Sequence, residues 1–339
     1  MSGRPTHRWL NGATVLRVLQ SRTVRVLFIL ATVALLALAL VDQGSLLRHD
    51  VGKLSVSTVI LAFVLCVAGL VCSLMVWRCV LADLGSRLHI GSAWRINFVG
   101  QLGKYLPGSV WPVLAEMELG AQRKVPRGRS AVSVLLASAV QIFTGCVVAA
   151  VVLPFSGRDT TGRYLWVLAL VPVGLVMLSP PVLNRMMNLA LRLVRRPPMT
   201  TGMSVRGLLV SAAWGVLYWL LNGVMVYALM GRFAGHGFRV ALVSTGAYAL
   251  SWVAGYLAIF APAGAGVREA VMVALLSTQT RSGTALLVAL VARALSVVAD
   301  GLTGAVGIGL LGRTQLRLLR EARTAPAPPP EPGGSPSPG

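Results

Sequence analysis

Residues 56–80 read VSTVILAFVLCVAGLVCSLMVWRCV, and the first charged residue of this stretch is Arg78. An α-helix rises about 1.5 Å per residue, so about 20 apolar residues cross the hydrocarbon core of a bilayer. The stretch is therefore long enough and apolar enough to cross a membrane as one helix. Arg78 lies near its end, where a long side chain can carry its charge to the interface.

Further apolar runs have the same character. Of the 339 residues, 55% are hydrophobic and 12% are charged, whereas a soluble domain averages about 25% charged residues. A water-soluble fold of this size could not bury so much apolar surface. The sequence predicts an all-α fold, a polytopic transmembrane helical bundle with about eight crossings and one or two broken or re-entrant segments. The further runs lie at 26–41, 131–153, 164–178, 208–230, 240–260 and 284–311, with a shorter one at 270–276.

The net charge of +21 comes mostly from arginines that lie just outside the apolar runs. Cytoplasmic loops of membrane proteins carry an excess of Lys and Arg, so this pattern predicts a cytoplasmic N-terminus and C-terminus in the cytoplasmic (inner) cell membrane. A nucleic-acid-binding protein would show a basic stripe with interleaved aromatic residues or a known motif, and neither is present. We therefore expect no nucleic-acid partner. The basic segments lie at 1–25, 123–129, 185–206 and 313–323.

Three regions follow from this pattern: a basic cytoplasmic arm at 1–25, a transmembrane domain at 26–312, and a basic, then Pro- and Gly-rich tail at 313–339. The composition of the tail cannot build a core and predicts disorder. The run 26–41 has two interpretations. Its Ala-Leu-Ala at 37–39 resembles a signal-peptide cleavage site, but the long basic arm and the many later runs favour a retained first helix.

The sequence offers no pattern for a metal site, a cofactor or an enzyme. The four cysteines lie within or at the ends of apolar runs without a CxxC pair, and the four histidines are scattered over loops and tails. A nucleotide-binding loop is absent as well. An intramembrane enzyme would need a nucleophile that faces a base, or a metal. We expect a protein that is not an enzyme and needs no cofactor.

The first interruption of the apolar pattern lies in the segment 87–129. Its centre, YLPGSVWP at 105–112, places two prolines and a glycine in a moderately apolar stretch. Proline removes a backbone donor and glycine tolerates unusual dihedral angles, so a helix breaks here. Non-helical backbone at membrane depth survives only against protein or a water-filled cavity. We predict a re-entrant helical hairpin over 93–120, with an amphipathic cytoplasmic linker helix as the alternative.

The second interruption lies at 262–269, which read PAGAGVRE. It ends one helix just before another begins, which leaves free backbone N–H groups and the positive end of a helix dipole beside Arg268. Such a helix start binds anions, and the phosphate of a phospholipid is the expected ligand at this depth.

Ionisable residues inside the predicted bundle are few, and such groups usually face a cavity or a partner. Arg293 and Asp300 are seven residues apart, which places them on one face of the last helix, about 10 Å apart. We expect ion pairs between Glu269 and Arg293 and between Arg268 and Asp300; the alternative is that such pairs only fix helix register. The candidate residues for lipid head-group binding are Gly264, Gly266, Arg268, Glu269, Arg293 and Asp300, and those of the first broken helix are Lys104, Pro107, Gly108 and Glu116.

The two interruptions resemble each other, since Glu116 follows Pro107 by nine residues and Glu269 follows Pro262 by seven. Paired interrupted segments mark the binding site in transporters that are built from repeats. Four apolar runs separate the two breaks, which predicts that both open to the same side of the membrane. An inverted repeat would need an odd number of crossings between them.

At these breaks the chain resembles the flippase-like transmembrane region of the lysylphosphatidylglycerol synthase family. Members share a Pro-Gly break in the first half and a Pro-Gly-Gly-x-Gly-x-x-Glu-like break in the second; the matching stretches here are YLPG at 105–108 and PAGAGVRE at 262–269. The resemblance covers most of 20–312. Ala263 stands where glycine is usual, and WP with ME in 111–118 replaces the Gly-Glu and later Arg of the family's first half.

The resemblance implies a membrane region that moves lipids between leaflets. Aminoacyl transfer in that family belongs to a separate soluble domain, which this sequence does not contain, so the resemblance argues against lysyl transfer. We therefore expect a flippase-like translocator that binds a membrane phospholipid or a lipid-linked substrate through Arg268 and the backbone after Gly266. Glu269, Arg293 and Asp300 would rearrange or titrate as the cavity changes its open side. The alternative is a non-transporting membrane subunit that docks an envelope-lipid or glycan enzyme through its basic loops.

Overall fold

The structure is a computed structural model that describes residues 52–105, 110–156, 172, 176, 179–193, 202–258 and 262–324. The predicted N-terminal arm and first helix, most of the run 164–178, the end of the tail, and both Pro107 and Gly108 lie outside the described residues. Within the described ranges, every regular element is a helix or a short 3-10 turn, which confirms the all-α prediction for them.

Nine helices and three 3-10 turns make up this part of the chain. The helices are α4 (Val56–Asp83), α5 (Ile90–Gln101), α6 (Trp111–Ala121), α7 (Arg127–Val152), α9 (Pro180–Leu193), α10 (Val205–Ala234), α11 (Phe238–Leu257), α12 (Val267–Leu276) and α13 (Ser282–Thr324); the turns are η1 (Leu102–Tyr105), η2 (Pro154–Ser156) and η3 (Pro262–Gly264).

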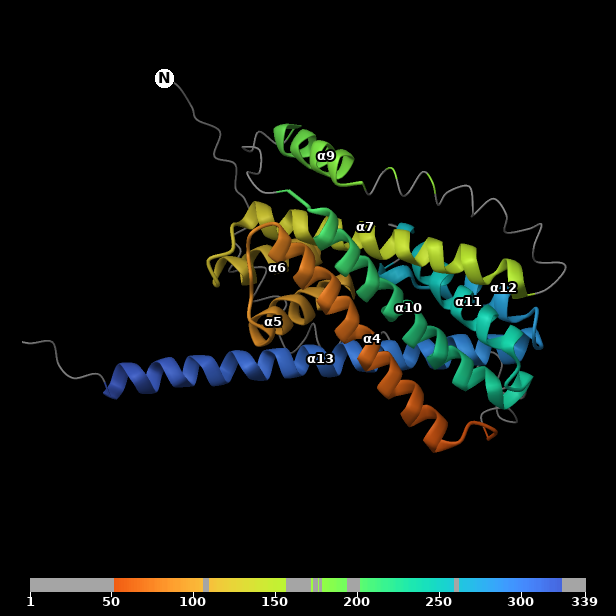
Figure 1. The fold of residues 1–339 in the computed structure, drawn as a ribbon. Coiled ribbons are helices and arrows are strands. Elements are labelled where there is room, and N and C mark those ends of the chain that lie inside the picture. The colour runs from red at the N-terminus through yellow and green to blue at the C-terminus, as the bar shows by residue number, and fades with distance from the viewer. Residues whose placement is uncertain are drawn as a thin grey trace, which may run out of the picture.

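Five of the described helices are long and apolar enough to cross a membrane. They are α4, α7, α10, α11 and the part of α13 that ends at Gly309. The chain is therefore a multi-pass membrane protein, and the total of about eight crossings stays a prediction. Beyond Gly309, α13 continues as a helix to Thr324 and projects from the bundle (Figure 1).

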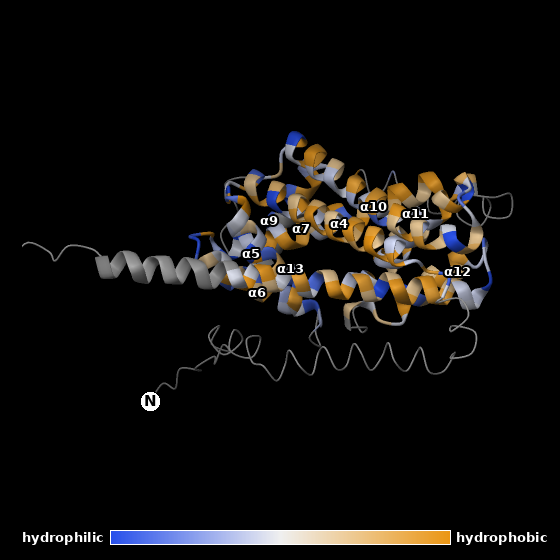
Figure 2. Ribbon diagram, turned by 90° about the horizontal axis from the view of Figure 1, so that it is seen from below, coloured by the Kyte–Doolittle hydropathy of each residue, from blue (hydrophilic) through white to orange (hydrophobic). Residues whose placement is uncertain are grey.

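The outside of the bundle carries large apolar side chains. Val56, Leu135 and Leu209 are each at least 60% exposed, and α4 alone adds Ile60, Leu61 and Val64. Figure 2 shows hydrophobic residues along the full length of the bundle helices. A soluble protein rarely exposes so continuous an apolar surface, whereas the hydrocarbon core of a bilayer matches it.

Hydrogen bonds define two ends of the bundle. At one end, Asp83 at the end of α4 accepts from the backbone N–H of Ser204, the N-cap of α10, at 2.6 Å. Arg129 in the first turn of α7 donates to the carbonyl of Gly85 at 3.0 Å. The segments at this end are rich in basic residues, so we call it the basic end. These residues are Arg123, Lys124, Arg127, Arg129 and Arg206. At the opposite end, Arg232 donates to the carbonyl of Lys53 just before α4.

The first broken segment is a hairpin that opens at the basic end. α5 begins seven residues after α4 ends, and α7 begins six residues after α6 ends, so both arms meet the rest of the chain at the basic end. α5 packs against α6, and η1, at the end of α5 away from the basic end, contacts both helices and is the described part of the tip. The described residues therefore form the predicted helix, break and helix, and not one continuous linker helix.

The second broken segment, α11–η3–α12, opens at the opposite end. α11 begins at Phe238, four residues after α10 ends there. Trp94 of α5 donates to the carbonyl of Thr303 at 3.1 Å, which places the later part of α13 at the basic end and its start, Ser282, at the opposite end. α12 has 10 residues, so it rises only about 15 Å and does not cross a bilayer core of about 30 Å.

The two halves of the bundle are therefore inverted copies of one pattern: a span, a hairpin and a span. α4, the α5–α6 hairpin and α7 form one half, and α10, the α11–α12 hairpin and α13 form the other. The equivalent spans α4 and α10 pack on each other. The second span of each half packs on the hairpin of the other half, α7 on α11 and α13 on α5, and the tips η1 and η3 touch. The prediction that both breaks open to the same side is wrong, because α11 returns through α12 and is half of a hairpin.

Small residues let the spans of the two halves approach closely. A Cβ on Gly145 of α7 would lie 2.8 Å from the ring of Trp219 on α10, and Trp219 is fully buried. The indole N–H of Trp219 donates to the hydroxyl of Thr144, one residue before this glycine, at 3.0 Å. Small residues at helix contacts with an interhelical hydrogen bond are the usual means of association inside a bilayer.

Candidate functional site

The site lies where α11 ends and η3 and α12 begin. The backbone turns sharply there: Ala263, Gly264 and Gly266 have φ of 50°, 71° and 82°. A Cβ on Gly264 would lie 2.7 Å from the Cα of Gly255 on α11. The aliphatic part of Arg268 also crosses Gly255, where a Cβ would overlap it. These glycines allow the tip of the hairpin to fold back on α11 and carry Arg268 across it.

Glu269 ties the start of α12 to α13. One carboxylate oxygen accepts from the backbone N–H of Gly266 at 2.7 Å, and the other lies 3.5 Å from Nε of Arg293. Arg293 also donates from Nη2 to the carbonyl of Ala263 at 3.0 Å. The predicted pair of Glu269 and Arg293 is therefore present. The N–H of Gly266, expected to be free for an anion, is taken by Glu269.

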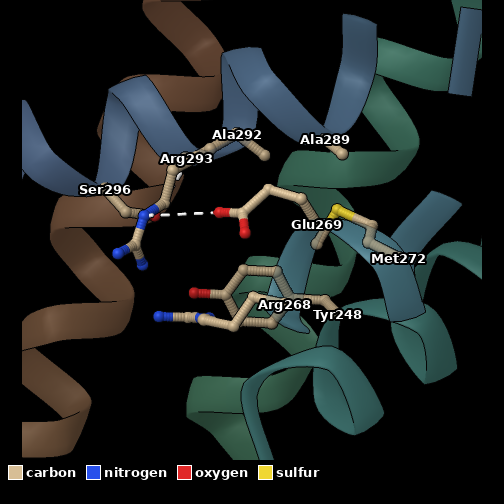
Figure 3. A pocket seen from close by; sticks show the side chains of 8 residues that line it. All are labelled: Tyr248, Arg268, Glu269, Met272, Ala289, Ala292, Arg293 and Ser296. Carbon is tan, nitrogen blue, oxygen red and sulfur yellow. Dashed lines mark hydrogen bonds and ion pairs between the residues drawn. The ribbon is translucent and has the colours of Figure 1, made fainter. Parts of the chain in front are cut away.

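A hollow of about 250 Å³, which includes the space at its mouth, lies beside this pair. It lies between α11, α12 and α13, which supply the side chains that line it (Figure 3). Its lining combines three charged side chains with two hydroxyl-bearing and three apolar ones. The lining residues are Tyr248, Arg268, Glu269, Met272, Ala289, Ala292, Arg293 and Ser296.

Arg268 is a second cation in the hollow. Its guanidinium lies 6.0 Å from the ring centroid of Trp252, a cation–π distance. Among the residues that the structure describes, it makes no hydrogen bond and no ion pair. Figure 3 shows its guanidinium and that of Arg293 on the same side of the hollow. The predicted pair of Arg268 and Asp300 is wrong, because Asp300 has other partners.

Asp300 binds the tip of the other hairpin. Its Oδ2 lies 2.7 Å from Nζ of Lys104 and accepts a hydrogen bond from the hydroxyl of Tyr105, both in η1. Asp300 is 7% exposed, so the pair is largely removed from solvent. The structure thus joins two predicted residues, Lys104 and Asp300, that the sequence assigned to different groups. The lysine reaches α13 because α5 runs beside it from Trp94 onward.

One helix therefore holds both hairpin tips. Arg293 binds η3 and Glu269, and Asp300, seven residues later, binds η1. Two helical turns, about 10 Å, separate the two attachment points.

Glu116 lies apart from this cluster. It is fully buried between α6 and α5, where it accepts hydrogen bonds from Asn97 and Gln101. It does not reach the hollow, so Glu116 does not join the head-group site. Pro107 and Gly108 are among the predicted residues whose positions the structure does not describe.

Several residues of the cluster were not predicted. Tyr105 was read only as part of the break, and Tyr248, Trp252 and Ser296 only as residues of apolar runs. A signal existed on α11: Tyr248, Trp252 and Tyr256 recur every four residues, which places three aromatic rings on one helix face. Trp252 and Tyr256 do stack in the structure, with ring centroids 5.2 Å apart.

Helices of membrane-spanning length, two opposed hairpins and ionisable side chains between them define a multi-pass integral membrane protein with a polar site among its helices. A family model for the lysylphosphatidylglycerol synthase TM region matches residues 23–304 of the chain. The chain belongs to this family. A search of curated proteins found no match.

Proposed function

We propose that the protein is a flippase-like lipid translocator of the cytoplasmic membrane, which moves a phospholipid or a lipid-linked substrate between the leaflets. The observation that carries this proposal is the charge in the hollow. Two guanidinium groups, of Arg268 and Arg293, share it with one carboxylate, of Glu269. The carboxylate balances one cation, so one positive charge remains for an anionic head group.

The depth of the hollow supports a lipid head group as the ligand. Arg293 lies eleven residues after the start of α13, which corresponds to about 17 Å along the helix axis. This is close to half of a hydrocarbon core of about 30 Å. A polar site at that depth serves a molecule that must pass the middle of the bilayer.

The space in the hollow that is open to a water-sized molecule is about 20 Å³, enough for about one water molecule. A head group would therefore enter only after the side chains that line the hollow move apart, and the acyl chains would stay in the bilayer. Tyr256 and Leu257, both exposed at the end of α11, offer an apolar surface next to the site.

Binding of a phosphate would exchange existing bonds for new ones. The N–H of Gly266 and the guanidinium of Arg293 both bind Glu269 in the structure. A phosphate that reaches Arg268 offers an alternative acceptor to both donors. Release of Glu269 would free α12 from α13 and let the second hairpin move.

The inverted halves offer a route to alternating access. In transporters with inverted repeats, the binding site lies at the interface of the repeats, and rocking of one repeat against the other exposes it to each side in turn. Here the hairpin tips η1 and η3 meet between the halves. Separation of α5 from α6 would open a path from the site to the basic end. Separation of α11 from α12 would open a path from the site to the opposite end.

The charge pattern gives the proposed orientation. Loops rich in Lys and Arg stay in the cytoplasm, so the basic end faces the cytoplasm and the N- and C-termini lie inside. The proposed partner is the lipid, and the proposal includes neither an enzymatic activity nor a nucleic-acid partner.

Exchange of a fluorescent phospholipid between leaflets of reconstituted vesicles tests the proposal. A membrane-impermeant quencher reports the fraction of label in the outer leaflet over time. We expect faster exchange with the wild type than with empty vesicles, and a loss of at least tenfold in the Arg268→Gln variant. Arg206→Gln, which removes an exposed arginine at the basic end, is the matched control and should retain the wild-type rate.

Equal exchange by the wild type, Arg268→Gln and empty vesicles, repeated with lipids of different head groups, would refute the translocator. Stoichiometric co-purification of one envelope-lipid or glycan enzyme would then favour the alternative, a membrane subunit that docks such an enzyme.

A further inference from the structure

Glu116 occupies the interior of the α5–α6 hairpin. Its side chain is fully buried in the middle of α6. It lies directly over Gly100 of α5, where an added Cβ would overlap the Cγ of the glutamate. The glycine therefore creates the space that the carboxyl group fills.

Among the residues that the structure describes, the hydrogen-bond partners of this carboxyl group are neutral. Oε1 accepts from Nδ2 of Asn97 at 3.4 Å and from Nε2 of Gln101 at 3.3 Å. Asn97 and Gln101 are four residues apart, so they lie on the same face of α5. Oε2 is buried and has no hydrogen-bond partner among the residues that the structure describes.

The ionisable residues on the neighbouring elements lie toward other helices or bind other partners. On α5, Arg95 lies on the side of α13, where a Cβ on Gly307 would be 3.6 Å from its Cα. In η1, Lys104 and Tyr105 bind Asp300.

The arginines of α7 also face away from Glu116. Arg127 binds Glu118 on the outside of the hairpin, with two hydrogen bonds of 3.0 Å, and Arg129 binds Gly85 and Ser86. Residues 106–109, which the structure does not describe, read LPGS and contain no ionisable residue. In the part of the chain that the structure describes, no cation pairs with Glu116.

We propose that Glu116 is a proton-binding site of this protein. A carboxylate in this position would be a buried charge without a counter-ion, whereas the neutral acid needs only hydrogen bonds. The acid is therefore the form that the closed hairpin holds. When α5 and α6 separate and water enters, the O–H bond breaks, the proton passes to water and the carboxylate remains, solvated.

The position of the site suggests what the proton does. The tip of the same hairpin is attached to α13 through Lys104 and Asp300 and touches η3. Protonation favours the closed hairpin and deprotonation the open one, so a proton gradient would bias the movement of this half. This coupling to lipid movement rests on the proposed function, but proton binding at Glu116 does not.

Infrared spectroscopy of the full chain tests the proton site directly. The protein is purified in a maltoside detergent, which has no ester carbonyl, and the carbonyl band of protonated carboxylic acids is followed with pH. An exposed glutamate loses its proton near pH 4.3. We expect a band in the wild type that persists at pH 7 and is absent from Glu116→Gln.

Glu118→Gln is the matched control. Glu118 lies two residues away on the outside of the same helix, and the hydrogen bonds from Arg127 lower its pKa, so it carries no proton at pH 7. This variant should keep the band. Glu116→Asp, which retains a carboxyl group, should shift the band. This variant replaces Glu116→Gln in the test if the glutamine variant does not fold. Absence of the band from the wild type at pH 7, or an unchanged band in both Glu116 variants, would overturn the proposal.

A second measurement separates the proton site from the proposed function. In vesicles with an imposed pH gradient, we expect the lipid exchange rate of the wild type to depend on the gradient and that of Glu116→Gln not to. A wild-type infrared band without any lipid exchange would refute the translocator and leave the proton site. Exchange that responds equally to the gradient in both proteins would refute the coupling.

Discussion

Gly264 and Gly266 both have a positive φ, 71° and 82°, but their surroundings differ. A Cβ on Gly264 would meet the backbone of Gly255, whereas a Cβ on Gly266 would meet nothing within 4 Å. The first glycine is therefore needed for both its dihedral angle and its size, and the second only for its dihedral angle.

This difference predicts unequal effects of alanine. Gly266→Ala should cost about 1–2 kcal/mol, the strain of a left-handed conformation for a residue with a Cβ. Gly264→Ala should cost about 1–3 kcal/mol more, because backbone must move to relieve the contact. Melting temperatures of the two detergent-purified variants give the comparison, and equal losses would show that η3 does not press on α11.

The attachment of η1 to α13 can be tested in the same way. Lys104→Met leaves the carboxylate of Asp300 largely buried, and among the described residues the hydroxyl of Tyr105 is then its remaining partner. We expect a loss of about 1–3 kcal/mol, the usual cost of a desolvated group that loses its partner. Lys124→Met, at an exposed loop position, is the control and should leave the melting temperature within about 1 °C.

At the scale of the elements, α7 depends on a close contact with α10. Gly145→Ala would place a methyl group against the ring of Trp219, which is buried and cannot yield. We expect a loss of about 1–3 kcal/mol despite the better helix propensity of alanine. Gly128→Ala, in the first turn of the same helix with open space around it, should be neutral or slightly stabilising. Thermal unfolding followed by circular dichroism distinguishes the two.

The spans were predictable because length and hydropathy alone identify them. The runs 56–80, 131–153 and 208–230 correspond to α4, α7 and α10 within a few residues at each end. The hairpin at 93–120 was also predictable, since proline and glycine break a helix whatever packs around it. α12 was harder. A run of seven apolar residues fits a crossing or a short return equally well, and only the position of α13 beside α5 decides between them.

The site was predictable only in part. Glu269 and Arg293 pair as expected, because both follow from local rules: an acid in the first turn of α12 and an inward arginine on the last span. The partner of Asp300 was not predictable, since it depends on how the first hairpin lies against α13. Glu116 lies in the first broken segment, as predicted, but its surroundings were not predictable for a similar reason: the sequence shows an acid near a break, and only the packing shows that Asn97 and Gln101 contact it.

For the whole molecule, the opposed hairpins predict a pattern of surface accessibility. After replacement of the four native cysteines, a single cysteine would be placed at Gly128, Gly237 or Gly283, which all have open space around them. An impermeant thiol reagent applied to intact cells should label positions 237 and 283, and should label position 128 only after permeabilisation. Labelling of 237 and 283 from different sides would contradict the hairpin α11–α12.

The two attachments of α13 lie on one continuous helix, and this has a mechanical consequence. A rigid helix transmits a shift of one end to the other, so Arg293 and Asp300 cannot move separately along its axis. A slide by the rise of one residue, about 1.5 Å, takes both donors and acceptors beyond hydrogen-bonding range at once. The helix therefore couples the two attachment points rigidly. An alanine inserted between 293 and 300 would rotate Asp300 by about 100° relative to Arg293 around the helix axis.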